Sequence, residues 1–297
     1  MIRSLLYVPA SSERFLAKAH ERGADAIILD LEDAVAPQEK ERARAVLKDA
    51  VPAVGRNGAT VFVRINAVST GLAFDDADAA CRAGAFGLFV AKVQAPAELA
   101  RLDELLDVTE REVSRARPMA LVPMLEDPGA VLDARAIAAA SRRTFALVSG
   151  SEDMATAMGA EPTPEVLRVP KLLVHLAAKA ARLVSFGMLR TVADFKDAQA
   201  VAASAREARA FGFDGASCIH PSVVPILNAA FSPAPEEIDR ARRMIAAFEA
   251  AKAKGEGAFR FEDKMVDEPV VARARALLAG IRNQGSGIRT PRRGQDD

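Results

Sequence analysis

Carboxylates are the first residues in this sequence that could do chemistry, and they stand directly after an apolar run. The segment ADAIILDLEDAV, residues 24–35, places Asp30, Glu32 and Asp33 at the end of what has the composition of a buried strand. Two carboxylates about 5 Å apart repel each other by about 3 kcal/mol at an effective dielectric constant near 20. A protein relieves that repulsion with a proton, a basic side chain or a bound cation. We therefore expect a counter-charge beside these residues.

Two further carboxylates, Glu126 and Asp153, follow apolar segments that are neighbours in the chain. Adjacent strands lie about 4.8 Å apart, so the two side chains should meet at one edge of a sheet. We expect no lysine beside them. Oxygen ligands without Cys or clustered His suit Mg²⁺, or Mn²⁺, better than Zn²⁺. The alternative is that Asp153 merely favours the start of a helix.

Short apolar segments alternate with longer segments of helical spacing, and these elements must position the carboxylates. The expected strands are residues 4–9, 25–30, 60–65, 87–92, 119–124, 144–149, 183–188 and 214–219. The expected helices between them include residues 13–23, 39–51 and 97–116. This alternation predicts parallel strands with crossover helices, and eight such units predict an α/β fold of the (β/α)8 TIM-barrel type. A doubly wound sheet is the alternative, but no glycine-rich dinucleotide loop follows the first strand.

The active site of a (β/α)8 barrel lies at the carboxyl ends of its strands, and more polar residues fall at these ends. They are Arg64 and Asn66 at the end of the third segment, Lys92 as the last residue of the fourth and His220 directly after the eighth. Arg64 suits either a substrate anion or a purely structural ion pair with Glu32 or Asp33. His220 stands before a proline, which favours a role in fixing a turn over a role in chemistry.

Some of the candidate residues also have a structural interpretation. Asp127 precedes Pro128, a pattern typical of a helix N-cap with proline in the first turn. Asp267, in MVDEP, fits an N-cap equally well. Arg14 and Lys18 are four residues apart and share one helix face, which is either solvated or an anion site.

Composition excludes some classes of protein. Lys+Arg and Asp+Glu both number 40, and a nucleic-acid-binding surface needs a basic excess, so we expect no nucleic-acid partner. Aromatic residues make up 5% of the chain, which predicts a core of Ala, Val, Leu and Ile. Cys81 and Cys218 lie far apart in the chain and indicate reduced thiols. No leader and no membrane-spanning run is recognised, so we expect a cytoplasmic protein without a membrane partner.

The alternation of strands and helices stops near residue 230. We expect residues 1–230 to form the catalytic barrel and residues 231–285 to form a small C-terminal helical lid or appendage. Residues 286–297 contain few apolar side chains and are expected to form a disordered tail.

The motifs of this chain, taken in order, resemble the citrate lyase β-subunit-like family of the HpcH/HpaI aldolase superfamily. The resemblance is carried by RSLLYVPASSERFLAKA, ILDLEDAV, VRIN, MLED, GSEDMA and FDGASCIHPSVV, and it runs from residue 3 to about residue 275. The later segment KGEGAF…KMVDEPVVARA is similar to the C-terminal part of malyl-CoA and citramalyl-CoA lyases. The seventh segment departs from the pattern, because VSFGML stands where many relatives have Ile-Asp-Gly. Ser185 or Phe186 therefore lies near the place of an acidic residue.

The resemblance implies roles for the residues around the expected barrel mouth. Glu126 and Asp153 match the two Mg²⁺ ligands of the family. Arg64 matches the arginine that holds the substrate carboxylate or carbonyl. Glu32 and Asp33 match the acidic pair beside that arginine and the metal-bound waters.

The resemblance also implies a shared site between subunits. Asp267 matches an acid/base aspartate that the family delivers from the lid of a neighbouring subunit, in a homotrimer or hexamer. Arg14 and Lys18 match positions that approach the phosphates of CoA.

The implied activity is that of a Mg²⁺-dependent carbon–carbon lyase. Such an enzyme cleaves, or forms, a malyl-, citramalyl- or citryl-type CoA thioester, with a keto acid and an acyl-CoA as the other reactants. A malyl-CoA thioesterase and a malate synthase-like condensing enzyme are alternatives. From a different class, a non-catalytic relative that binds a metabolite also stays open.

Overall fold

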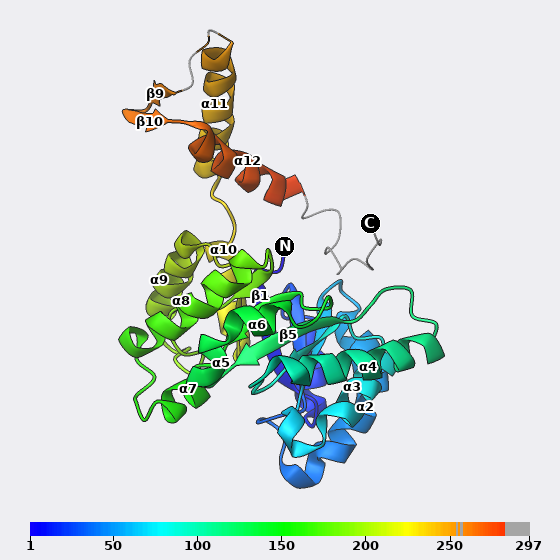
Figure 1. Cartoon of the computed structure of the whole chain (residues 1–297). Helices are drawn as coiled ribbons and strands as arrows, with labels where there is room; N and C mark the ends of the chain where they lie inside the picture. The colour runs from blue at the N-terminus through cyan, green and yellow to red at the C-terminus, as the bar shows by residue number, and fades with distance from the viewer. Residues whose placement is uncertain (254, 256–257, 283–297) are drawn as a thin grey trace. The chain divides into compact units, whose positions relative to one another are not determined.

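The computed structural model describes residues 1–253, 255 and 258–282, and the expected tail at residues 286–297 lies outside these residues. The chain divides into two compact units (Figure 1). One comprises Ile2–Phe231, and the other comprises Met1 with the described residues from 232 to 282. Within the described part of the chain, no helix is both long and apolar enough to cross a membrane. The expected roles of the two units, catalytic barrel and lid, stay predictions.

The larger unit contains an eight-stranded parallel sheet in the order β7-β6-β5-β4-β3-β2-β1-β8. Its strands are β1 (Ser4–Pro9), β2 (Ala26–Asp30), β3 (Thr60–Ile65), β4 (Gly87–Val90), β5 (Ala120–Leu125), β6 (Ala146–Ser149), β7 (Val184–Phe186) and β8 (Ala216–Cys218). All eight expected segments therefore contain a strand, with ends shifted by one or two residues in most. The strands lie between helices and the barrel interior and are buried on both faces, which is why they appear as continuous apolar runs.

The barrel closes between β7 and β8, so the (β/α)8 prediction is confirmed. Phe186 and Gly215 form a parallel bridge, and the Gly187 N–H donates to the Gly215 carbonyl at 2.9 Å. A side chain at Gly215 would place its Cβ 2.1 Å from the Ile2 carbonyl oxygen. The chain just before β8 approaches the backbone before β1 this closely because residue 215 has no side chain.

Helices cover the outer face of the sheet. They are α1 (Glu13–Ala19), α2 (Lys40–Gly55), α3 (Ala73–Arg82), α4 (Pro96–Glu112), α5 (Pro128–Leu132), α6 (Ala134–Ala139), α7 (Glu152–Ala157), α8 (Pro164–Ala180), α9 (Ala198–Phe211) and α10 (Val224–Ala230). Local signals set several of their ends. The Asp197 side chain accepts the Gln199 and Ala200 N–H groups at 3.0 Å, and α9 ends at Gly212 with a left-handed φ of 97°.

The barrel interior differs from the aliphatic core that composition suggested. Phe62 on β3 contacts Phe86 and Phe89 edge-on, with ring centroids 5.2 and 5.3 Å apart. The ring centroids of Phe62 and Phe145 are also 6.4 Å apart. Phe145 directly precedes β6, which is not a sheet neighbour of β3, so the two rings meet inside the barrel. The expectation of an aliphatic core holds for the layer between sheet and helices, where Ala, Val, Leu and Ile dominate. Aromatic edge-to-face contacts fill the wide barrel interior with few residues.

The smaller unit contains α11 (Pro235–Lys252), a two-stranded antiparallel hairpin of β9 (Phe259–Phe261) and β10 (Lys264–Val266), and α12 (Glu268–Arg282). It has its own apolar core, in which Met244 and Phe248 of α11 belong to one cluster with Val266 and Val271.

Candidate active site

A cavity of about 410 Å³ lies at the carboxyl ends of the barrel strands. Its polar and charged lining includes Tyr7, Asp30, Arg64, Glu126, Asp153 and Lys171. Of the residues expected at the barrel mouth, Asp30, Asp33, Arg64, Glu126 and Asp153 line this one cavity.

Arg64 is held by a set of carboxylates from β2 and the residues after it. Asp30 is its direct cross-strand partner, and Arg64 donates to both Asp30 oxygens at 2.7 and 2.6 Å. Its Nη1 also lies 2.9 Å from Glu32 Oε2 and 3.4 Å from Asp33 Oδ2. These anions raise the pKa of Arg64 even though burial works in the opposite direction. The predicted pairing with Glu32 and Asp33 is confirmed, but Asp30 makes the closest contacts.

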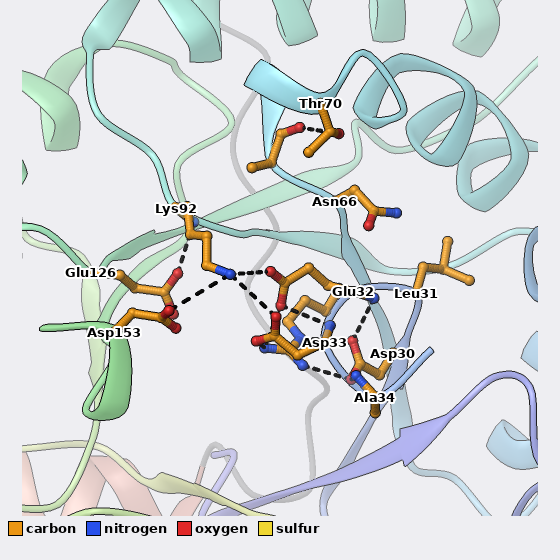
Figure 2. A network of polar contacts seen from close by, with 12 residues as sticks. Asp30, Leu31, Glu32, Asp33, Ala34, Asn66, Thr70, Lys92, Glu126 and Asp153 are labelled. Carbon is orange, nitrogen blue, oxygen red and sulfur yellow. Dashed lines mark hydrogen bonds and ion pairs between the residues drawn. The ribbon is translucent and has the colours of Figure 1, made fainter. Parts of the chain in front are cut away.

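Lys92 corrects one expectation, because we expected no lysine beside Glu126 and Asp153. Its Nζ donates to Glu32 Oε1 at 2.7 Å and to Asp33 Oδ1 at 3.2 Å, and it lies 3.7 Å from Asp153 Oδ1 (Figure 2). Its backbone N–H donates to Glu126 Oε2 at 2.9 Å. Lys92 has a left-handed φ of 53°, which an apolar-run pattern does not reveal. Lys92 therefore lies between Glu32 and Asp33 on one side and Glu126 and Asp153 on the other, two pairs that the sequence analysis treated separately.

Glu126 directly follows β5, Asp153 lies in the first turn of α7 after the neighbouring strand β6, and the two side chains lie side by side in Figure 2. The last paired residues of β5 and β6 are Leu125 and Ser149, so Glu126 follows directly at the strand end. A Cβ on Gly150 would lie 2.5 Å from Cγ and Oε1 of Glu126, so the glycine makes room for this carboxylate. Burial, together with the charges of Asp153 and Glu32, raises the pKa of Glu126 to about 8.

The two carboxylates fit a Mg²⁺ ion. Within residues 1–253, 255 and 258–282 no three His, Cys, Asp or Glu side chains form a metal-binding group. Mg²⁺ does not need three, because it keeps several waters and is commonly held by one or two carboxylates together with substrate oxygens. Glu126 is buried beside two other carboxylates, Asp153 and Glu32, and a cation bound there would offset their mutual repulsion. Glu126 and Asp153 are therefore suited to hold the ion.

Three other expected residues have structural contacts. The Asp127 side chain accepts the Gly129 N–H at 2.8 Å, which confirms the N-cap. His220 accepts the Ser222 N–H at 3.2 Å, which confirms its role in a turn. Asn66 donates to the buried Asp76 at 2.6 Å and so is engaged in a structural contact.

The remaining predicted residues are not part of the cavity lining. Asp267 belongs to the smaller unit, where its Oδ1 accepts the Val270 N–H at 3.4 Å at the start of α12. This contact supports the N-cap interpretation and does not test an acid/base role. Arg14 and Lys18 are exposed on α1, and the Arg14 guanidinium lies 5.6 Å from the Phe15 ring centroid.

The sequence did not single out Tyr7 and Lys171, and it gave Asp30 no role of its own. Asp30 carried a signal, since it ends a strand at the register position of Arg64. The Tyr7 ring centroid lies 5.0 Å from the Arg64 guanidinium carbon, and burial raises the pKa of its phenol. Lys171 appears in the sequence as an ordinary helical lysine, so only the fold reveals its position in the cavity wall.

Comparisons with known proteins agree with this geometry. A model of the HpcH/HpaI aldolase/citrate lyase family matches residues 3–221. The chain is 37% identical to the (3S)-malyl-CoA thioesterase of Cereibacter sphaeroides over 278 residues, which is 93% of each protein. It is 32% identical to the citrate lyase subunit beta of Leuconostoc mesenteroides, over 93% of this chain and 92% of that protein. A solved structure of CitE from Mycobacterium tuberculosis, in complex with magnesium, acetoacetate and coenzyme A, is similar with a TM-score of 0.76 and 29% identity, covering 93% of this chain and 96% of that one.

Proposed function

Because the chain belongs to the HpcH/HpaI aldolase/citrate lyase family, we propose that it is a Mg²⁺-dependent carbon–carbon lyase. Its substrate would be a malyl-, citramalyl- or citryl-type CoA thioester, which it cleaves to a keto acid and an acyl-CoA or forms from them. The observation that carries this proposal is the meeting of Glu126 and Asp153 with Arg64 around one cavity. The complex of the related CitE with magnesium, acetoacetate and coenzyme A supports the same ligand classes.

Glu126 and Asp153 would hold the ion, and a bound Mg²⁺ would act as a Lewis acid toward the carboxylate and hydroxyl oxygens of the substrate. Arg64 would face the same oxygens, with its plane fixed by Asp30. Lys92 and Arg64 keep Glu32 and Asp33 in ion pairs, so negative charge at the cavity mouth is balanced before the substrate arrives.

In the cleavage direction the substrate hydroxyl would lose its proton to water and its oxygen would become the keto oxygen. The carbon–carbon bond would break with its electron pair going to the α-carbon of the acyl-CoA fragment. That fragment then needs one proton on its α-carbon. Asp267 would donate this proton, and in condensation it would remove it. We propose that Asp267 acts from a neighbouring subunit of a homo-oligomer, a trimer or a hexamer, and that Arg14 and Lys18 approach the CoA phosphates. A cytoplasmic location is part of the same proposal.

The 37% identity to a malyl-CoA thioesterase favours a second candidate, hydrolysis of the thioester. The two reactions have different products. A lyase releases a keto acid and leaves the thioester bond intact, whereas a thioesterase releases free CoA thiol and a hydroxy acid.

The test is incubation of the full chain with malyl-CoA, citramalyl-CoA and citryl-CoA, with Mg²⁺ and with EDTA. Keto acid is measured as its hydrazone and free thiol by a chromogenic disulfide. Keto acid without thiol supports the lyase, and thiol without keto acid supports the thioesterase. An Arg64→Ala chain should lose turnover, whereas Arg82→Ala, which removes an exposed arginine on α3, should keep it. Turnover of no ester would contradict both candidates and favour a metabolite-binding relative.

A further inference from the structure

Lys171 is a buried cation in the cavity wall to which the proposed reaction gives no role. It lies on α8, its exposed fraction is 4%, and it lines the same cavity as Arg64 and the two proposed metal ligands. In the described part of the chain no hydrogen-bond acceptor and no carboxylate oxygen lies within bonding distance of its ammonium group. Its nitrogen is not among the fully buried, unpartnered atoms of the described residues, so it opens to the cavity, where a ligand can reach it. A lysine this buried is uncommon unless its charge is paired.

The other cations of the site are already engaged. Arg64 contacts three carboxylates and Lys92 contacts two within 3.2 Å. Among the described residues, Glu152 is the carboxylate whose charge acts on Lys171. Glu152 accepts a hydrogen bond from the Thr191 hydroxyl and not from Lys171. Burial lowers the pKa of Lys171 to about 8, as expected for an ammonium group without a bonded anion. The unmatched positive charge in this cavity is therefore that of Lys171.

Lys171 and Arg64 face the cavity from opposite sides of the barrel. The helix that carries Lys171 packs against β6 and β7, whereas Arg64 lies on β3. In the sheet order, β6 and β7 are three and four strands away from β3, which is halfway around an eight-stranded barrel. Glu126 and Asp153 follow β5 and β6, between the two cations. Lys171 and Arg64 therefore flank the two proposed metal ligands, one on each side of the cavity.

We propose that Lys171 binds a second carboxylate of the substrate, distinct from the one held near Arg64, Glu126 and Asp153. The preferred substrates are then hydroxy or keto acids with two free carboxylates, which among the thioesters named above means the citryl type. A cavity of about 410 Å³ holds an acid of this size. The identity of the first carboxylate site rests on the proposed function.

Binding of two small acids tests the assignment without turnover. (S)-Malate and (S)-lactate share a hydroxyl and an adjacent carboxylate, and only malate has a second carboxylate. Isothermal titration of the full chain with each acid in the presence of Mg²⁺ should show malate binding roughly 10- to 100-fold tighter, since that is the usual worth of one charge-assisted hydrogen bond. Equal affinities, or no measurable binding of malate, would overturn the proposal.

Variants of Lys171 distinguish a binding role from a structural one. Lys171→Met should bring the affinity for malate down to that for lactate and leave lactate binding within about threefold. Lys171→Arg should restore part of the preference for malate. If Lys171 serves only as a distant counter-charge to Glu152, Lys171→Met would lower the thermal midpoint and leave the malate-to-lactate ratio unchanged, which would refute the assignment. The proposed lyase activity can fail separately, because thioester turnover is measured in a different assay from the loss of malate preference.

Discussion

Arg64 and Asp30 form a two-pronged ion pair across adjacent strands, with Nε to Oδ1 at 2.7 Å and Nη2 to Oδ2 at 2.6 Å. The two residues are register partners in β2 and β3. Asp30 also accepts the Glu32 N–H at 2.9 Å and the Ala34 N–H at 3.3 Å. The carboxylate that fixes the arginine plane therefore also fixes the loop that carries Glu32 and Asp33.

We expect Asp30→Asn to lower the free energy of unfolding by about 3 kcal/mol and to weaken binding of malate in the presence of Mg²⁺. Asp30 is 1% exposed, and removing one partner of a buried ion pair leaves the other charge uncompensated. Urea unfolding and calorimetric titration check the two effects. Asp25→Asn is the matched control, because Asp25 pairs with Arg3 in similar geometry at the other end of β2. If Asp25→Asn weakens malate binding as much as Asp30→Asn does, Asp30 has no special role in the site.

We expect Lys92→Met to tighten Mg²⁺ binding by roughly fivefold. The Lys92 ammonium lies 3.7 Å from Asp153 Oδ1. In water-like surroundings it would repel a divalent ion at a separation of roughly 7 Å by about 1 kcal/mol, which corresponds to about fivefold in affinity. The substitution keeps the backbone N–H that donates to Glu126. Calorimetric titration with Mg²⁺ measures the change, and Lys92→Arg should leave the affinity close to that of the unmodified chain. Weaker binding in Lys92→Met would show that the ammonium group positions the ligands instead.

The stability of the metal-free protein should fall as the pH rises toward 8. The folded-state pKa of Glu126 is raised to about 8 from an ordinary value of 4.5, so between these pH values the folded state holds a proton that the unfolded state releases. The contribution of Glu126 to the free energy of unfolding is largest below pH 4.5 and is lost as the pH rises through 8. Between these values the free energy of unfolding falls by at most about 1.4 kcal/mol per pH unit.

Urea unfolding at pH 5.5, 6.5 and 7.5, with and without Mg²⁺, measures this dependence. Saturating Mg²⁺ takes the place of the proton and should flatten the slope. Glu126→Gln cannot titrate at this position, so its stability without metal should depend less on pH across the same range. Identical slopes for Glu126→Gln and the unmodified chain would mean that Glu126 is ionised in the folded protein throughout.

The sequence predicted the elements and the local caps of this fold well, because those signals are local. Strands buried on both faces form continuous apolar runs, so all eight expected segments contain a strand. The caps at Asp127 and the turn at His220 depend only on the next few residues. The barrel pattern placed Arg64, Glu126 and Asp153 at one mouth, and all three line the cavity. The family resemblance added their catalytic roles, which stay predictions.

Placement that depends on tertiary structure was not predicted. Lys92 reaches Glu32 and Asp153 from a left-handed backbone conformation, which no residue pattern indicates for a lysine. Lys171 belongs to a helix whose pattern allows an exposed lysine, and only the packing of α8 against β6 and β7 buries it. In both cases the side chain's environment comes from residues far away in the sequence.

We expect Gly150→Ala to weaken Mg²⁺ binding by roughly tenfold or more while the chain stays folded. The new Cβ would lie 2.5 Å from Cγ and Oε1 of Glu126, so the carboxylate must move. The backbone of Gly150 does not have a positive φ, so alanine is not strained there. Calorimetric titration measures the affinity, and circular dichroism checks the fold. Unchanged affinity would mean that the proposed site tolerates displacement of Glu126.

Asp267→Asn separates the proposed acid/base role of this residue from its role at the start of α12. Asparagine caps helices about as well as aspartate does, so the Val270 N–H keeps its acceptor and the smaller unit keeps its stability. The amide cannot exchange the α-carbon proton, so turnover of the preferred thioester should fall by a factor of roughly 100 or more with Mg²⁺ binding unchanged. Glu268→Gln, at the next residue, is the matched control and should keep its activity.

Mixing inactive chains then tests whether the site is shared between subunits. A mixed oligomer of Arg64→Ala and Asp267→Asn chains contains some sites in which an intact barrel meets an intact Asp267. Activity should therefore return when the two inactive chains are refolded together, and it should stay absent when each is refolded alone. A verified mixed oligomer without activity would place Asp267 in the site of its own chain. If Asp267→Asn alone remains active, Asp267 lies outside the reaction and the mixing experiment does not apply.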